Sequence, residues 1–337
     1  MAALLGPRTG ATRPATWWRA YLPVAVTAVV LAAVPLVLGG SGYLMSLAAT
    51  VLIFAAYAIG FNVIFGATGQ LFLCMGALAG LAGYTSTILA DDRGWPLLLS
   101  LSTGVLLATL LGGVFSWVAV RRHLEVIFVG IITLTFSLAF TSLAQGLRTV
   151  TGGETGRVVA AGGPVLRDRI ASYYLFLAVV VAFLVVFRWI ERSHVGWAFR
   201  ASKDDAVAAE LAGIDVARYR ILAGAIGSAM IGLAGALFAH HEAFISPTSY
   251  AFAHVDVRTL VILALGGIGS LLGPVVGAVA IGIVDEVLRP LGQLRLTIYG
   301  AVLIALFLGL RTGLVPAVTA AVRAVGLGRR HDDGPRT

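Results

Sequence analysis

Apolar runs of about twenty residues recur along almost the whole chain, separated by short charged or glycine-rich stretches. A run of that length crosses the hydrocarbon core of a bilayer as a helix. Only 12% of the residues are charged, about half the share found in a soluble domain. The pattern predicts an all-α, polytopic transmembrane helical bundle of about ten spans, with eight still possible. The expected spans are residues 21–40, 44–66, 70–90, 96–120, 124–146, 172–190, 219–240, 256–271, 274–289 and 295–313.

Two of these regions are less regular than the others. Residues 70–90 and 256–289 are rich in glycine or short, and we expect broken or re-entrant helices there. Small residues also recur at four-residue spacing, which allows helix backbones to approach closely in lipid. These residues are Gly76 and Gly80, then Ser228, Gly232 and Ala236, and finally Gly273 and Gly277.

The basic residues predict an orientation. With the N-terminus in the cytoplasm, about two thirds of the 24 arginine and lysine residues fall on the cytoplasmic side, as the positive-inside rule requires. We therefore assign the basic excess to membrane topology and expect no nucleic-acid partner. The predicted organisation is a cytoplasmic tail (1–20), a transmembrane domain (21–315) with a cytoplasmic loop (191–218), and a second cytoplasmic tail (316–337).

Motifs for enzymatic chemistry are missing from the sequence. The single lysine, Lys203, is followed by Asp204 and does not belong to a G-x-x-x-x-G-K-[ST] phosphate loop. There is no H-E-x-x-H or G-x-S-x-G motif, and the lone Cys74 excludes an intrachain disulfide or a cysteine metal cluster. We therefore expect a non-catalytic chain without a metal or cofactor of its own.

Ionisable residues are scarce at membrane depth. Asp285 and Arg289, four residues apart near the end of one span, are expected to neutralise each other. Without an obvious carboxylate relay, the energy for any transport would come from outside the chain. Several uncharged polar residues do lie at membrane depth, and they either hold helices together or line a pathway. The candidates for a translocation pathway are Asn62, Gln70, Thr133 and Thr135.

One long charged stretch, "HVGWAFRASKDDAVAAELAGIDVARYR", interrupts the apolar pattern at residues 194–220. Ser202 and Asp205 fit a capping box that starts a helix of about ten residues, and Gly213 would end it. Such a short helix is marginal alone in water. Its apolar stripe would therefore pack against the rest of the chain or in the groove of a partner. The residues of this stripe are Val207, Leu211 and Ile214.

Several segments, in this order, resemble the LivM-type permease subunit of branched-chain amino-acid ABC importers. They are "GFNVIFGATGQL", "TGGETG", the stretch from "SHVGWAFRASKDD" to "GLAGALFA", "ISPTSYAF", "LGGIGSLLGPVVGA" and "IYGAVLIALFLGLRTGL". The resemblance implies a fold similar to type II importer permeases, in the inner membrane of a bacterium. It also implies four kinds of partner: a LivH-like permease, two cytoplasmic ATP-binding subunits that hold ATP and Mg, a periplasmic or lipid-anchored substrate-binding protein, and membrane lipid.

The same resemblance implies a role for the charged stretch. "AAELAG" is similar to the coupling segment of ABC importers, and the residues carried over to face the ATPase are Arg200, Asp204, Asp205, Glu210 and Gly213. The chain departs from the family at Phe72, Cys74 and Met75, and "RRHLEV" stands where the family has "RLRGPY". These departures keep other solutes open as alternatives, namely urea, short amides or another small polar molecule. A secondary transporter and a membrane scaffold without transport activity are the remaining alternatives.

Overall fold

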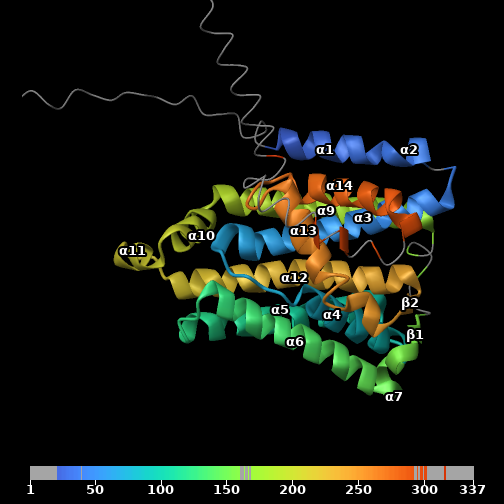
Figure 1. The fold of residues 1–337 in the computed structure, drawn as a ribbon, viewed down its shortest axis with the longest axis horizontal. Helices are drawn as coiled ribbons and strands as arrows, with labels where there is room; N and C mark the ends of the chain where they lie inside the picture. Colours follow the sequence, from blue (N-terminus) through green and yellow to red (C-terminus); the bar gives the residue numbers. More distant parts are fainter. Residues whose placement is uncertain are drawn as a thin grey trace, which may run out of the picture.

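A computed structural model describes residues 21–38, 40–159 and 168–291, with a few single positions around 163–166 and 294–315. In this part of the chain, long helices run side by side along one axis (Figure 1). Helices α10 (His194–Asp204) and α11 (Ala206–Leu211) project at one end, and strands β1 (Arg157–Val158) and β2 (Phe244–Ile245) lie at the opposite end. We refer to these as the α11 end and the β end.

Five helices in the described residues are long and apolar enough to cross a membrane. The all-α membrane bundle is thus confirmed, whereas the count of about ten spans is not. The last expected span (295–313) is described at a few single positions only, and both tails lie outside the described residues. The five helices are α3 continued by the π-helix η2 (Gly42–Gly66), α5 (Leu97–Arg121), α6 (Val126–Gly146), α9 (Arg169–Arg192) and α12 (Val216–Glu242).

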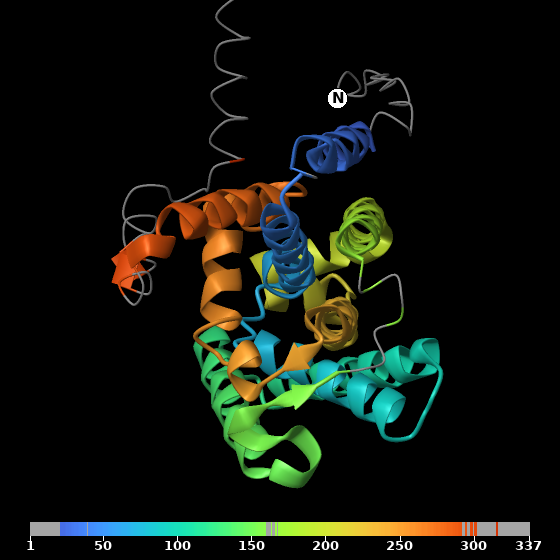
Figure 2. The same ribbon diagram turned by 90° about the vertical axis from the view of Figure 1, so that its right-hand side faces the viewer.

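The remaining apolar runs form shorter pieces. The first run is divided at Ala33 into α1 (Leu22–Ala32) and α2 (Val34–Leu38). The two regions expected to contain broken helices do contain them. Residues 69–74 are not helical and lead into α4 (Met75–Asp91). In the second region, α13 (Asp256–Gly266) is separated from α14 (Gly273–Val287). Viewed from the β end, α13 is seen from its side, whereas α9 and α12 are seen end-on (Figure 2). The bundle therefore contains broken helices beside its long ones.

Small residues bring α5 and α12 into close contact. A Cβ atom placed on Gly112 of α5 would lie 1.8 Å from the Ser228 hydroxyl oxygen of α12. One placed on Gly224 would lie 1.9 Å from the hydroxyl oxygen of Ser116. The spacing of Ser228 and Gly232 thus marks a real helix crossing, at which van der Waals packing replaces the hydrophobic effect as the cohesive force in lipid.

This crossing gives a matched pair of substitutions on adjacent residues. We expect Gly112→Ala to destabilise the protein by about 1–3 kcal/mol, because the added methyl group forces α5 and α12 apart. Gly113→Ala is the control, since its new Cβ would have no neighbour closer than 4.0 Å. Thermal unfolding in detergent should show a lower midpoint for Gly112→Ala only. Equal midpoints would contradict the close crossing.

The broken segments interlock in a similar way. A Cβ on Gly76 of α4 would lie 2.2 Å from the carbonyl oxygen of Tyr250, and the Tyr250 ring lies against Gly80. A Cβ on Gly277 of α14 would lie 2.0 Å from the carbonyl oxygen of Ile262 in α13. The small residues in 76–80 and 273–277 therefore allow α4 and α14 to contact the segments that follow α12.

The β end contains a small sheet that the hydrophobic pattern does not predict. Strands β1 and β2 pair antiparallel, with Arg157 opposite Ile245. The Arg157 guanidinium also forms an ion pair with Asp92 at the end of α4. That hydrogen-bonded contact lowers the pKa of the Asp92 carboxyl. The sheet thereby links the connection after α6 to the end of α4 and to the segment after α12.

Candidate functional site

The stretch expected as the cytoplasmic loop (191–218) consists largely of helices α10 and α11. The capping box was wrong in one respect. Helix α10 continues to Asp204, so Ser202 lies in its interior and its hydroxyl donates to the carbonyl oxygen of Ala198 at 2.6 Å. Asp205 is the cap of α11 instead, because its backbone is extended and its carboxylate accepts the N–H of Ala208 at 3.0 Å. Helix α11 therefore has 6 residues and not about ten.

The end of α11 follows the expectation. Gly213 has a φ of +84°, in the left-handed region that glycine adopts without steric penalty. Its N–H donates to the carbonyl oxygen of Glu210, and the N–H of Ile214 donates to that of Ala209. These two bonds form a Schellman motif. Helix α11 is thus a short element with both ends capped.

The two large apolar side chains of α11 face away from the bundle. The exposed fractions of Val207 and Leu211 are 68% and 86%, whereas Ala209 on the other face is buried. Figure 1 shows α11 beyond the ends of the long helices. Ile214 lies after the helix end and lines a cavity between α10 and the start of α12. In the part of the chain that the structure describes, Val207 and Leu211 therefore do not pack against the bundle.

Charged residues surround this pair on the same end of the molecule. Asp204, Asp205 and Glu210 are exposed. The Arg200 guanidinium lies over the Trp197 ring at 5.1 Å and donates to the carbonyl oxygen of Glu191. The α11 end thus presents two apolar side chains within a charged surface, which is the usual anatomy of a protein interface.

Asn62, one of the four expected pathway residues, is fully buried in η2. Its side-chain oxygen accepts the N–H of Gly269 at 2.8 Å, and its amide donates to the carbonyl oxygen of Ser270 at 2.9 Å. Both partners lie in the connection between α13 and α14. Asn62 therefore joins the end of α3 to that connection.

Gln70 and Thr133 fix the non-helical segment 69–74. The Gln70 amide donates to the backbone carbonyl of Arg220 at 2.9 Å, and the Thr133 hydroxyl accepts the N–H of Leu73 at 2.9 Å. Thr135 differs, because it is exposed and its hydroxyl donates to Ile131 within α6. Three of the four candidates thus join separate elements in this structure. Their role in a translocation pathway stays a prediction.

Asp256, a buried carboxylate with three hydrogen-bond partners, was not among the candidates from the sequence. Its carboxylate is fully buried and accepts the N–H groups of Met75 at 2.5 Å and Gly76 at 3.2 Å, as well as the Ser137 hydroxyl at 3.3 Å. An acidic side chain at a helix start satisfies N–H groups that lack partners within the helix. Asp256, in the first turn of α13, therefore caps the neighbouring helix α4. Its one signal in the sequence was an aspartate that opens an apolar run.

The expected pairing of Asp285 with Arg289 was also wrong. Asp285 forms an ion pair with Arg258 of α13, whose guanidinium lies 3.9 Å from the centre of the Phe54 ring. Arg289 lies 3.8 Å from Glu286 and contacts Tyr43. Because α13 packs across α14, a partner distant in sequence reaches Asp285 inside the bundle, which helical spacing does not reveal.

Comparisons with known proteins agree with this architecture. Residues 43–310 match a family described as "Branched-chain amino acid transport system / permease component". The chain is 26% identical over 301 residues to the high-affinity branched-chain amino acid transport system permease protein LivM of Escherichia coli, covering 81% of this chain and 70% of that protein.

Two further relatives broaden the comparison. The permease protein LivH of the same Escherichia coli transport system is 26% identical, over 69% of this chain and 80% of that protein. The fructose import permease protein FrcC of Rhizobium meliloti is 26% identical, over 67% of this chain and 65% of that protein. No solved structure gives a significant match. The chain is therefore a multi-pass membrane protein that belongs to the branched-chain amino acid transport permease family.

Proposed function

We propose that the chain is the transmembrane permease subunit of an ABC importer that moves branched-chain amino acids across a bacterial inner membrane. The family match and the similarity to LivM support the substrate class. The sequence lacks a phosphate loop, so ATP and Mg would be bound by partner ATPase subunits. The similarity to both LivM and LivH supports a heteromeric pair of permeases, completed by a substrate-binding protein.

One observation supports the coupling role most strongly: Val207 and Leu211 are exposed on a capped helix that extends beyond the bundle. Exposed apolar residues surrounded by charge are typical of interaction sites. We assign this surface to a groove of the ATPase, with Arg200, Asp204, Asp205 and Glu210 at its polar rim. The α11 end and both termini would then be cytoplasmic, in agreement with the excess of basic residues there.

A second substrate class is supported by a specific observation. The chain is also similar to a fructose permease and, at 21% identity, to the ribose import permease protein RbsC of Haemophilus influenzae. A small polar solute is therefore the alternative cargo. The two classes differ in what can compete for uptake, because a pocket for an aliphatic side chain excludes a sugar.

Uptake competition separates these two classes of cargo. Cells that express the importer would take up radiolabelled leucine, and unlabelled leucine, isoleucine, valine, urea, acetamide, fructose or ribose would be added in excess. We expect the three branched-chain amino acids alone to reduce the signal, and deletion of the gene to remove it. Competition by fructose or urea, with no effect of isoleucine and valine, would contradict the proposed cargo.

A further inference from the structure

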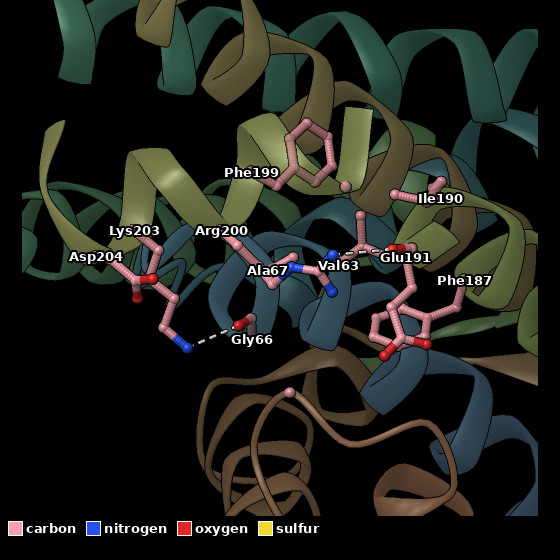
Figure 3. A pocket seen from close by; sticks show the side chains of 12 residues that line it. Val63, Gly66, Ala67, Phe187, Ile190, Glu191, Phe199, Arg200, Lys203 and Asp204 are labelled. Carbon is pink, nitrogen blue, oxygen red and sulfur yellow. Dashed lines mark hydrogen bonds between the residues drawn. The ribbon is translucent and has the colours of Figure 1, made fainter. Parts of the chain in front are cut away.

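Lys203, the only lysine of the chain, does not point to the exposed surface of α11. Its ammonium donates to the carbonyl oxygen of Gly66 at 2.8 Å, across a cavity of about 220 Å³ between α10, α9 and the end of α3. Figure 3 shows the side chain extended from α10 toward Gly66. The carbonyl groups at a helix end lack partners within the helix, and a cation is favoured there by the helix dipole. Lys203 thus joins α10 to the last residue of η2.

Gly66 is itself fixed to a second element. A Cβ on Gly66 would lie 2.0 Å from the side-chain oxygen of Asn62 and 3.0 Å from the N–H nitrogen of Gly269. The Asn62 side chain binds Gly269 and Ser270, in the connection between α13 and α14. The Lys203 contact therefore reaches α3 directly, and α13 and α14 through one buried side chain.

A second connection runs from the neighbouring residue of α10. The guanidinium of Arg220 donates to the carbonyl oxygen of Ser202 at 2.9 Å, and the backbone carbonyl of Arg220 accepts the Gln70 amide. Gly66 and Gln70 lie on either side of the point where helix gives way to the non-helical segment 69–74. The end of α10 is thus hydrogen-bonded toward both sides of this break.

Segment 69–74 leads directly to the start of α4. Leu73 is held by Thr133 of α6, and the start of α4 is capped by Asp256 of α13. Residues 69–74 are not helical, and the side chains of Phe72 and Cys74 within this segment are fully buried. A displacement at Gly66 and Gln70 would therefore be passed along the segment to the start of α4. Close-packed interiors transmit such displacements and do not absorb them.

We infer that Lys203 is a positioning residue for energy coupling: it transmits movement of α10 to Gly66 and thereby to the broken helices α4 and α13. This role rests on the proposed function and refines it. Val207 and Leu211 would bind the ATPase, whereas Lys203 would carry the resulting movement into the membrane domain. The two roles predict different defects, because a transmission residue affects transport per ATP hydrolysed and leaves the ATPase bound.

The test uses the complex purified from native membranes through a tag on this chain and reconstituted in liposomes. ATP hydrolysis and uptake are measured together, with whichever solute of the competition panel the wild-type complex transports. We expect Lys203→Met to retain the ATPase and to hydrolyse ATP, while the solute moved per ATP falls about tenfold, as loss of a hydrogen bond from a charged group allows. Lys203→Arg should restore most of the ratio, because it keeps a cationic donor.

Arg192→Met serves as the matched control, because Arg192 is another exposed cation near the same end of the bundle. Its ratio should equal that of the wild type. Gln70→Leu, which removes the second connection, should also lower the ratio and supports the inference if Lys203→Met yields no folded complex. An unchanged ratio for a folded Lys203→Met complex, or loss of the ATPase from it, overturns the inference alone, and so does an unchanged ratio for Gln70→Leu where Lys203→Met yields no folded complex. A wild-type complex that hydrolyses ATP without moving any solute of the panel overturns the proposed function and this role with it.

Discussion

Replacing Leu211 by aspartate is expected to abolish ATP-driven uptake while membrane insertion stays normal. The side chain is 86% exposed in the structure, so an aspartate there does not disturb the fold of this chain. In the proposed complex the same position lies in an apolar groove, where a charge without a partner is strongly unfavourable. Central apolar contacts of interfaces contribute about 2 kcal/mol or more, which corresponds to a loss of affinity of about 30-fold.

Two measurements check this prediction: co-purification of the ATPase with the tagged chain, and uptake of labelled leucine. Leu211→Met is the matched control, because it retains an apolar side chain of similar volume and should keep both activities. Val207→Asp should reproduce the defect from the other contact position. An ATPase that still co-purifies with Leu211→Asp in normal amount would contradict docking through α11.

The second large effect concerns Asp256. We expect Asp256→Ala to lower the free energy of unfolding by about 3–5 kcal/mol, because the substitution leaves buried donors from Met75, Gly76 and Ser137 without their acceptor. The start of α4 would lose its cap at a buried position, where unpaired N–H groups are costly. Thermal unfolding in detergent and the yield of folded protein measure the loss.

Variants that remove different numbers of these hydrogen bonds show whether the loss of stability comes from the lost cap of α4 or from any substitution at this site. Ser137→Ala removes one donor together with its bond, and a loss of only about 1 kcal/mol is expected. Asp256→Asn keeps one carbonyl acceptor, so its stability should lie between those of the wild type and Asp256→Ala. Wild-type stability for Asp256→Ala would show that α4 does not depend on this carboxylate.

Hydrophobic periodicity was sufficient to predict the fold class and the ends of most long helices. The expected run 96–120 corresponds to α5, and 124–146 corresponds to α6, because each is a single apolar stretch bounded by charge. Glycine content also indicated the two broken regions. The short sheet at the β end could not be predicted, since two residues in each strand show no period.

The polar contacts were harder to predict, because they depend on which elements become neighbours. Asp285 was assigned to Arg289 by helical spacing, yet α13 brings Arg258 to it. Ser202 fits a capping box that starts a helix, but it lies inside α10, a helix that the motif does not predict. Asp256 caps a helix that begins 181 residues earlier in the chain. Local patterns identify candidate residues, whereas the broken helices determine which of them meet.

Reconstitution in liposomes tests directly whether ATP hydrolysis drives transport through this chain. The complex containing this chain would be placed in liposomes, and uptake of radiolabelled leucine would be measured with ATP supplied on the side of the α11 end. We expect uptake that requires ATP hydrolysis, persists without any sodium or proton gradient, and disappears with Leu211→Asp. Leucine uptake by the purified chain alone, driven by an ion gradient and independent of ATP, would contradict it.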